Sequence, residues 1–128
     1  FIISTNTLSI NIEAEHFYLE PEIAIPCGVI LNELITNSFK YAFPDNSKGE
    51  ININMKKVDE NYELVYRDTG VGLKKDLNIK NSKTLGLQLI DTLSAQLGNT
   101  PVIKNHNGLQ YEFLIKPVKQ KNRMVHPN

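Results

Sequence analysis

The sequence has only one cysteine, Cys27, among 128 residues. A single cysteine excludes a disulfide framework within the chain and fits a reducing compartment, so we expect a cytoplasmic location. Cys27 stands in an apolar stretch at the start of a predicted helix. This context favours a buried, inert thiol over a reactive one.

Long apolar runs are also absent. No stretch approaches the ~18 consecutive apolar residues that a membrane-spanning helix needs, and no basic-then-apolar signal peptide opens the chain. Since the first residue is Phe1 and not Met, we expect a piece of a longer polypeptide, whose parent protein can still be membrane-anchored.

An excess of charge of either sign is missing too, because 14 Lys and Arg balance 14 Asp and Glu. A net charge of zero gives no general attraction to nucleic acid or to anionic lipid. We therefore expect no nucleic-acid partner and no direct membrane contact. A small ligand or another protein is the expected partner, and any phosphate binding must depend on a few specific groups.

Several common catalytic and metal-binding motifs do not occur. The chain has no GxxxxGK[ST] run, no CxxC pair and no HExxH pair, and His16, His106 and His126 are scattered over an expected strand, turn and tail. A hydrophobic fraction of 41% with 22% charged residues is typical of one globular domain. We expect this domain over residues 1–117, followed by a polar C-terminal tail over residues 118–128.

Apolar periodicity predicts the order strand, helix, hairpin, loop, helix, hairpin. This order indicates an α+β fold, a two-layer sandwich with helices on one face of a mixed, mostly antiparallel sheet. Pro26 is tolerated in the first helix only in or near its first turn. The expected elements are one or two short edge strands within residues 1–19, a helix over 20–43, strands over 50–57 and 62–68, a mobile loop over 73–83, a helix over 85–97, and strands from 102 and over 111–115.

The first candidate site lies on the helix that ends at Phe43. At about 100° per residue, Glu33, Asn37 and Lys40 line up along one stripe, since they are four and then three residues apart. A carboxylate, an amide and an amine in this arrangement can hold a metal and phosphates, but an ordinary solvated helix face has the same pattern. The other arc of the helix holds Ile30, Leu31, Leu34, Ile35, Ser38, Tyr41 and Ala42.

The second candidate is Asp68-Thr69-Gly70-Val71-Gly72, which follows a predicted strand. A carboxylate only accepts hydrogen bonds, so it suits an exocyclic amino group such as that of adenine. The two glycines let the backbone approach a flat ligand and hinge the loop that follows. The alternative is a β-turn capped by Asp68.

The third candidate is Thr84-Leu85-Gly86-Leu87, at the start of the second helix. Free backbone amides and the positive end of the helix dipole make such a start an anion site, and Gly86 lets phosphate oxygens approach the amides. The alternative is a helix with a Thr84 cap and an incidental glycine.

In this order the three motifs resemble the N, G1 and G2 boxes of the GHKL nucleotide-binding family, over about residues 20–117. The strings LNELITN (residues 31–37), AFP (residues 42–44) and TLGLQLI (residues 84–90) are similar to the ATP-binding domain of sensor histidine kinases of the HWE-related class. The resemblance implies a Bergerat fold that binds ATP and Mg²⁺ under a lid formed by about residues 73–83.

The resemblance also implies roles for single residues. Asn37 matches the Mg²⁺ ligand, Lys40 the residue that meets phosphate, Tyr41 a residue beside the base or ribose, and Asp68 the acceptor of the adenine amino group. The remaining matches are Gly70, Gly72 and Gly86 as lid hinges, with Thr84 and Leu87 beside Gly86 in the third motif. Glu33 is the catalytic candidate, because it falls where ATPases of the family carry a water-activating glutamate and many histidine kinases carry asparagine.

Two features depart from the family pattern. The late Gly-Thr-x-Phe pattern is replaced by Gly108-Leu109-Gln110-Tyr111, so a threonine near the adenine is missing and the affinity is expected to differ. The lid is short and lacks a phenylalanine-bearing box, which agrees with the HWE-related class.

The resemblance implies the catalytic ATP-binding domain of a histidine kinase, which transfers the γ-phosphoryl group of Mg-ATP to a histidine. That histidine is expected on a separate dimerisation domain of the same parent chain, and a response regulator is then an indirect partner. The fragment alone is expected to bind ATP and transfer phosphate poorly. The alternatives are an anti-sigma-type serine kinase of the same fold, an ATPase that uses Glu33, or a non-catalytic nucleotide-sensing interaction module, which the altered Leu109 keeps open.

Overall fold

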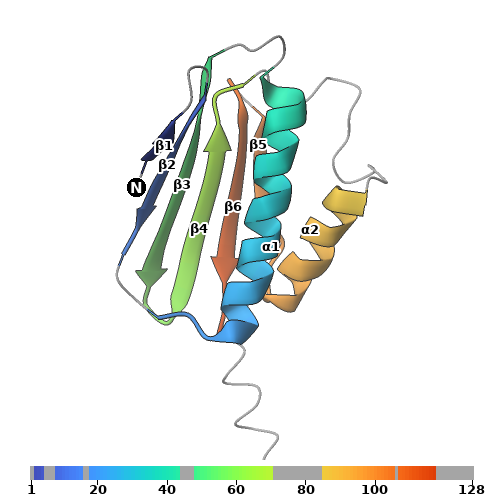
Figure 1. Cartoon of the computed structure of the whole chain (residues 1–128). Coiled ribbons are helices and arrows are strands. Elements are labelled where there is room, and N and C mark those ends of the chain that lie inside the picture. The colour runs from blue at the N-terminus through green and yellow to red at the C-terminus, as the bar shows by residue number, and fades with distance from the viewer. Residues whose placement is uncertain are drawn as a thin grey trace, which may run out of the picture.

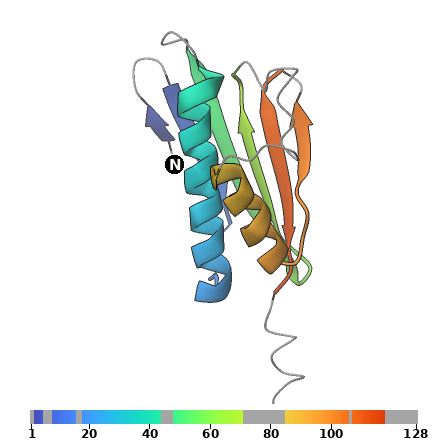
Figure 2. The same cartoon turned by 90° about the vertical axis from the view of Figure 1, so that its right-hand side faces the viewer.

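The computed structural model describes residues 2–4, 8–15, 18–43, 48–70, 85–105 and 107–117. In these residues, a six-stranded sheet in the order β1-β2-β3-β4-β6-β5 is covered on one face by two helices (Figures 1 and 2). The elements are β1 (Ile2–Ser4), β2 (Leu8–Ala14), α1 (Pro21–Asn37), η1 (Ser38–Ala42), β3 (Gly49–Val58), β4 (Asn61–Asp68), α2 (Leu85–Gln96), β5 (Val102–Asn105) and β6 (Leu109–Ile115).

The sheet confirms the expected α+β sandwich of mixed, mostly antiparallel strands. The pair β2–β3 is parallel, and the other four strand pairs are antiparallel. β1 and β2 lie at one edge, as the sequence pattern indicated. Parallel strands need a crossover connection, and here the chain between β2 and β3 runs through α1 on one face of the sheet.

Two short turns fix the register of the hairpins. Asp59 has a φ of 56° between β3 and β4, a left-handed conformation that a short polar side chain tolerates. Asn107 and Gly108 have φ values of 52° and 118° between β5 and β6. In the resulting register Ile51 of β3 faces Asp68 of β4. Arg67 of β4 pairs with Gln110 of β6, so β4 ends where β6 begins, at the same end of the sheet.

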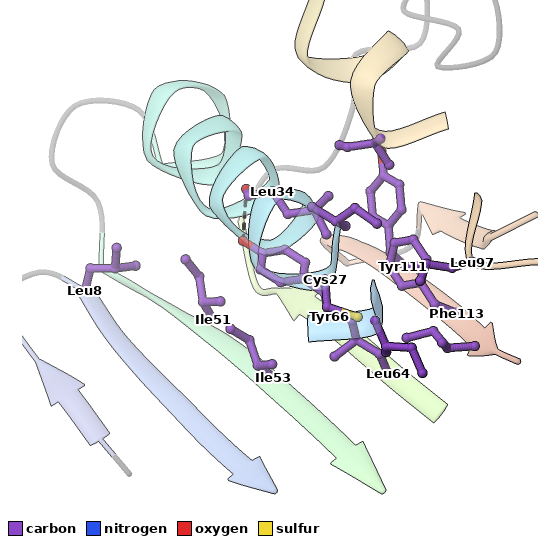
Figure 3. Packing of buried hydrophobic residues seen from close by; sticks show 14 residues of the cluster. Leu8, Cys27, Leu34, Ile51, Ile53, Leu64, Tyr66, Leu97, Tyr111 and Phe113 are labelled. Atoms are coloured by element: carbon purple, nitrogen blue, oxygen red, sulfur yellow. Dashed lines mark hydrogen bonds between the residues drawn. The ribbon is translucent and has the colours of Figure 1, made fainter. Parts of the chain in front are cut away.

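The core lies between the sheet and the helices (Figure 3). α1 contributes residues spaced three or four apart, which form one buried stripe: Ile23, Cys27, Ile30 and Leu34. The sheet contributes Leu8, Ile51, Ile53, Leu64, Tyr66, Tyr111, Phe113 and Ile115, and the second helix contributes Ile90 with Leu97 just beyond its end. Burial raises the pKa of the Cys27 thiol to about 11, so the thiol stays protonated at neutral pH and agrees with the expected inert role.

Helix α1 begins with Pro21 as its first residue, where the missing N–H has no helical partner in any case. Pro26 lies inside the helix, just beyond the first turn, and has no N–H to donate to the carbonyl of Glu22. The expected helix therefore forms despite a proline slightly further along than its first turn.

The C-terminal end of this helix differs from the expected α-helix through Phe43. The α-helix ends at Asn37, and the chain continues as the π-helical segment η1. At the junction the carbonyl of Leu34 accepts hydrogen bonds from the Ser38 N–H and from the Tyr66 hydroxyl. A side chain that inserts into the ladder of helical hydrogen bonds disturbs its regular pattern, and π-turns of this kind recur at functional sites.

Helix α2 ends as expected, because Gly98 has a φ of 79° just beyond it. The expected mobile loop over residues 73–83 and the tail over residues 118–128 lie outside the described residues. Within the ranges given above, no helix has both the length and the apolar character needed to cross a membrane.

Candidate functional site

The three sequence motifs meet at the C-terminal half of α1, which lies beside the start of α2 and over the sheet near the end of β4 (Figures 1 and 2). Two contacts join them. Ser38, directly after α1, donates a hydrogen bond to Asp68 at the end of β4. Glu33 of α1 lies against Gly86 in the first turn of α2. The fold therefore brings together residues that are far apart in the chain.

Asp68 is the buried centre of this site, with only 1% of its surface exposed. It continues the inward alternation of Leu64 and Tyr66 along β4, which directs its side chain toward the helices. Its Oδ1 accepts hydrogen bonds from the backbone N–H groups of Gly70, at 3.1 Å, and Leu109, at 3.2 Å. One carboxylate oxygen thus ties the end of β4 to the turn after it and to the start of β6.

The hairpin turn before β6 packs directly against this strand end. A Cβ atom added to Gly108 would lie 2.0 Å from the carbonyl oxygen of Asp68, and the φ of +118° at Gly108 is one that L side chains rarely adopt. Only glycine fits there, so the backbone of β6 can approach closely enough for the Leu109 N–H to reach Asp68.

The other carboxylate oxygen, Asp68 Oδ2, accepts a hydrogen bond from the Ser38 hydroxyl at 2.8 Å. Ser38 Oγ lies 2.5 Å from the Tyr66 hydroxyl, which also donates to the carbonyl of Leu34 at 3.1 Å (Figure 3). Burial raises the pKa of Tyr66 above its usual value, so its hydroxyl stays protonated. No buried side-chain nitrogen or oxygen of the described residues lacks a hydrogen-bond partner.

The two oxygens of Asp68 differ in what they can still bind. A carboxylate offers about four acceptor positions, two on each oxygen. The two backbone amides occupy those of Oδ1, whereas Ser38 occupies one of those of Oδ2. Among the described residues Ser38 is the partner of Oδ2, which leaves one further acceptor position on this oxygen, and an amino group on a flat ring can use it.

Glu33 is half-buried, and its carboxylate faces the start of α2. A Cβ atom built on Gly86 would lie 2.6 Å from Glu33 Oε2 and 3.6 Å from Glu33 Cδ. The first turn of a helix has backbone amides without helical partners and the positive end of the dipole. The carboxylate thus lies beside the turn that the sequence indicated as a phosphate site.

The other residues of the predicted stripe follow along the same helix. Asn37 is half-buried as the last residue of α1, and Lys40 is exposed in η1. Asn37 supplies a neutral oxygen of the kind that Mg²⁺ accepts, and Mg²⁺ usually takes only one or two protein oxygens, together with phosphates and waters. No group of three or more His, Cys, Asp or Glu side chains that could hold a metal occurs in the described parts of the chain.

The remaining predicted site residues are distributed as follows. Gly70 holds Asp68 through its N–H, and Leu87 is half-buried next to Gly86 in the first turn of α2. The backbone of Tyr41 lies in η1, but its side chain is not among the described parts. Gly72, Thr84 and the expected lid also lie outside the described residues.

Sequence reasoning missed the two hydroxyl groups beneath Asp68. Ser38 was the polar residue on the otherwise apolar arc of the first helix, which is a signal of a buried polar contact. Tyr66 belonged to an inward-facing alternation that leads directly to Asp68. The backbone N–H of Leu109 could not have been found, because its role does not depend on the side chain.

The known proteins to which this chain is similar are histidine kinases. The chain is 26% identical over 110 residues to the sensor histidine kinase PdtaS of Mycobacterium tuberculosis, which covers 84% of the chain and 22% of PdtaS. It is 25% identical over 92 residues to blue-light-activated histidine kinase 2 of Erythrobacter litoralis, covering 71% of the chain and 27% of that protein. The chain therefore spans about a quarter of the length of these curated relatives. No family model matches it.

Solved structures agree on the fold. The histidine kinase domain of the Erythrobacter litoralis EL346 blue-light activated histidine kinase matches with a TM-score of 0.84 and 21% identity, over 97% of this chain and 58% of that one. The catalytic domain of the histidine kinase ThkA matches with a TM-score of 0.65 and 17% identity, over 85% and 79%. The chain has the fold of histidine kinase catalytic domains, and its relatives are sensor histidine kinases, as the motif resemblance implied.

Proposed function

We propose that this chain is the ATP-binding catalytic domain of a sensor histidine kinase. One observation carries the proposal: in a fold of this class, the buried Asp68 carboxylate ends a central strand, and the described residues leave a single acceptor position on its Oδ2. The domain would comprise residues 1–117, with residues 118–128 as a polar tail. A buried free thiol at Cys27 supports a reducing, cytoplasmic environment.

The proposed role of Asp68 is to select adenine. Its Oδ2 would accept a hydrogen bond from the exocyclic amino group of the base. Guanine has a carbonyl oxygen at the same ring position, so two acceptors would face each other and one would remain unpaired in a buried place. This arrangement favours ATP over GTP. Tyr41 would lie beside the base or ribose, and Gly70 and Gly72 would act as lid hinges, as the resemblance implies.

The proposed phosphate site lies between α1 and α2. The amide oxygen of Asn37 would hold Mg²⁺, and Lys40 would neutralise phosphate charge from η1. The start of α2, at Thr84, Gly86 and Leu87, would attract phosphate oxygens through the positive end of the helix dipole. When bound, Mg-ATP supplies the phosphoryl group and the compensating cation, and these residues position both.

Glu33 is the proposed catalytic residue. Its carboxylate already lies beside the turn that would bind phosphate, which is where an incoming nucleophile must approach. There it can accept a hydrogen bond or a proton from the attacking imidazole. The acceptor histidine would lie on a dimerisation domain of the same parent chain, and a response regulator would receive the phosphoryl group afterwards.

The test is phosphotransfer from radiolabelled ATP to the dimerisation domain of the parent protein, added as a separate polypeptide. We expect the chain alone to bind Mg-ATP with little phosphorylation, and labelling of a histidine on the added domain. Asn37→Ala should abolish this transfer. Unchanged transfer by that variant would overturn the Mg²⁺ assignment of Asn37.

Three readouts separate the alternatives. Phosphoserine on a partner would indicate an anti-sigma-type serine kinase, and rapid phosphate release abolished by Glu33→Gln would indicate an ATPase. An absence of ATP binding in calorimetry would favour a non-catalytic interaction module. The relatives and the structural neighbours are histidine kinases by name, which favours the first proposal over these three.

A further inference from the structure

A row of hydrogen-bonded, buried hydroxyl groups runs beneath the site, from helix α1 to the carboxylate of Asp68. It joins the Leu34 carbonyl, the Tyr66 hydroxyl, the Ser38 hydroxyl and Asp68 Oδ2 in that order. Tyr66 is 0% exposed, Ser38 3% and Asp68 1%. Groups buried this deeply cannot exchange their partners for water without a cost, which favours retention of these hydrogen bonds.

The number of protons determines the direction of each hydrogen bond. Each hydroxyl has one proton, and an ionised carboxylate has none. The Ser38 proton therefore points to Asp68 Oδ2, and Ser38 Oγ accepts from Tyr66. The Tyr66 proton is shared between Ser38 and the Leu34 carbonyl. A hydroxyl that accepts one hydrogen bond donates the next one more strongly, so Tyr66 strengthens the contact between Ser38 and Asp68.

Ser38 and the backbone amides hold opposite ends of the same carboxylate. The amides of Gly70 and Leu109 hold Oδ1, whereas the Ser38 hydroxyl is the described partner of Oδ2. Without Ser38, the position of Oδ2 would depend on Oδ1 alone. Since Oδ2 is the oxygen that the described residues leave with an open acceptor position, Ser38 sets the direction of that position.

We propose that Ser38 is a positioning residue for base recognition, whose hydroxyl, oriented by Tyr66, directs the free acceptor position of Asp68 Oδ2 toward the amino group of adenine. This inference rests on the proposed function of the chain as an ATP-binding domain. It assigns to Ser38 a contribution that depends on the amino group of the ligand and not on its phosphates or ribose.

A ligand without the amino group provides the test. Purine riboside triphosphate has a hydrogen atom where ATP has the amino group and is otherwise the same. Calorimetry would measure the Kd of both nucleotides, with Mg²⁺, for the unaltered chain and for Ser38→Ala. We expect Ser38→Ala to raise the Kd of ATP about tenfold, which is the effect of losing a hydrogen bond to a charged group. The Kd of the analogue should change less than about twofold.

Ser94→Ala is the matched control. Ser94 is also a buried serine, 1% exposed, but its hydroxyl donates to the Ile90 carbonyl at 2.6 Å within α2. The same atom is removed at the same depth, away from Asp68. We expect this variant to bind both nucleotides like the unaltered chain. Tyr66→Phe is a second variant, which removes the other hydroxyl group of the row. We expect it to lower the affinity for ATP about threefold and to leave the affinity for the analogue unchanged.

The outcomes are distinct. A selective loss of ATP affinity in Ser38→Ala and Tyr66→Phe supports the proposal. Equal losses for both nucleotides, or none, would overturn it while ATP binding by the unaltered chain leaves the proposed function intact. If the unaltered chain binds neither nucleotide, the proposed function itself fails. Thermal unfolding of each variant verifies that it is folded, and if Ser38→Ala is not, Tyr66→Phe alone decides.

Discussion

The carboxylate of Glu33 in α1 lies directly against Gly86 in α2, so closely that a Cβ atom at position 86 would be 2.6 Å from Glu33 Oε2. This contact joins the candidate catalytic residue to the candidate phosphate-binding turn. The neighbouring carboxylate, and not the backbone conformation, restricts a side chain at position 86, since no positive φ occurs there.

Replacing Gly86 with alanine should therefore act on the position of Glu33. The Cβ atom meets the flexible end of a side chain, so we expect the carboxylate to move and the fold to persist. Phosphotransfer to the dimerisation domain should fall about tenfold or more, because misplacement of a catalytic group by about 1 Å is costly. Single-turnover transfer rates measure the effect.

Gly28→Ala is the control for this substitution. Gly28 is an exposed residue of α1, and a Cβ atom there would meet nothing within 4 Å. An alanine inside a helix is favoured over glycine, so we expect the free energy of unfolding to rise by about 0.5–1 kcal/mol with unchanged transfer. A normal transfer rate in Gly86→Ala would contradict the proposed placement of Glu33.

Glu33→Gln should separate catalysis from binding. Glutamine keeps the shape of the side chain but cannot accept a proton, so we expect the transfer rate to fall about 100-fold and the Kd of Mg-ATP to change little. Rapid-quench kinetics and calorimetry measure the two quantities. Glu22→Gln removes a charge from an exposed position in the first turn of the same helix, and it should transfer like the unaltered chain. An equal rate in Glu33→Gln would exclude the role as a base.

Asp68→Asn should lose both ATP binding and stability. The new amide nitrogen donates hydrogen bonds, so it cannot accept one from Ser38 or from an amino group. We expect the affinity for ATP to fall about 100-fold or more. The free energy of unfolding, measured with urea, should fall by about 1–3 kcal/mol. Glu63→Gln, which removes a charge from a partly exposed residue of the same strand, should leave ATP binding unchanged. Normal ATP affinity in Asp68→Asn would refute the adenine assignment.

The buried thiol predicts a loss of stability at alkaline pH. Burial raises the pKa of Cys27 from 9.0 to about 11, so the unfolded chain releases this proton first. The contribution of the thiol is fully present below pH 9 and is lost as the pH rises toward 11, by about 2–3 kcal/mol in all. Urea unfolding at pH 8, 9 and 10 measures it.

Cys27→Ala is the control for the alkaline effect. Its stability at pH 8 should be lower, because the side chain is buried, but its decline between pH 8 and 10 should be smaller than that of the unaltered chain. Parallel declines in the two proteins would show that other groups, such as the buried hydroxyls of Tyr66 and Tyr111, cause the effect.

The sequence predicted the elements well because their signals are local. The buried stripe of α1, the alternation of β3 and β4, and the glycine after α2 depend on residues a few positions apart. The π-helical end of the first helix was not predicted, because it coincides with a hydrogen bond to Leu34 from Tyr66, which belongs to a different element. Ser38 was missed as a site residue for the same reason, because its partners Tyr66 and Asp68 belong to β4, far away in the sequence.

The sequence by itself determined which residues are available, which faces of each helix and strand are apolar, and the order of the three motifs. Only the tertiary structure decided how they combine. In the described residues, the amides of Gly70 and Leu109 occupy the two acceptor positions of Asp68 Oδ1, one position remains on Oδ2 beside Ser38, and Glu33 lies against Gly86. The reason is that periodicity reports the surroundings of one element, whereas a hydrogen-bond partner depends on distances between elements that only packing establishes.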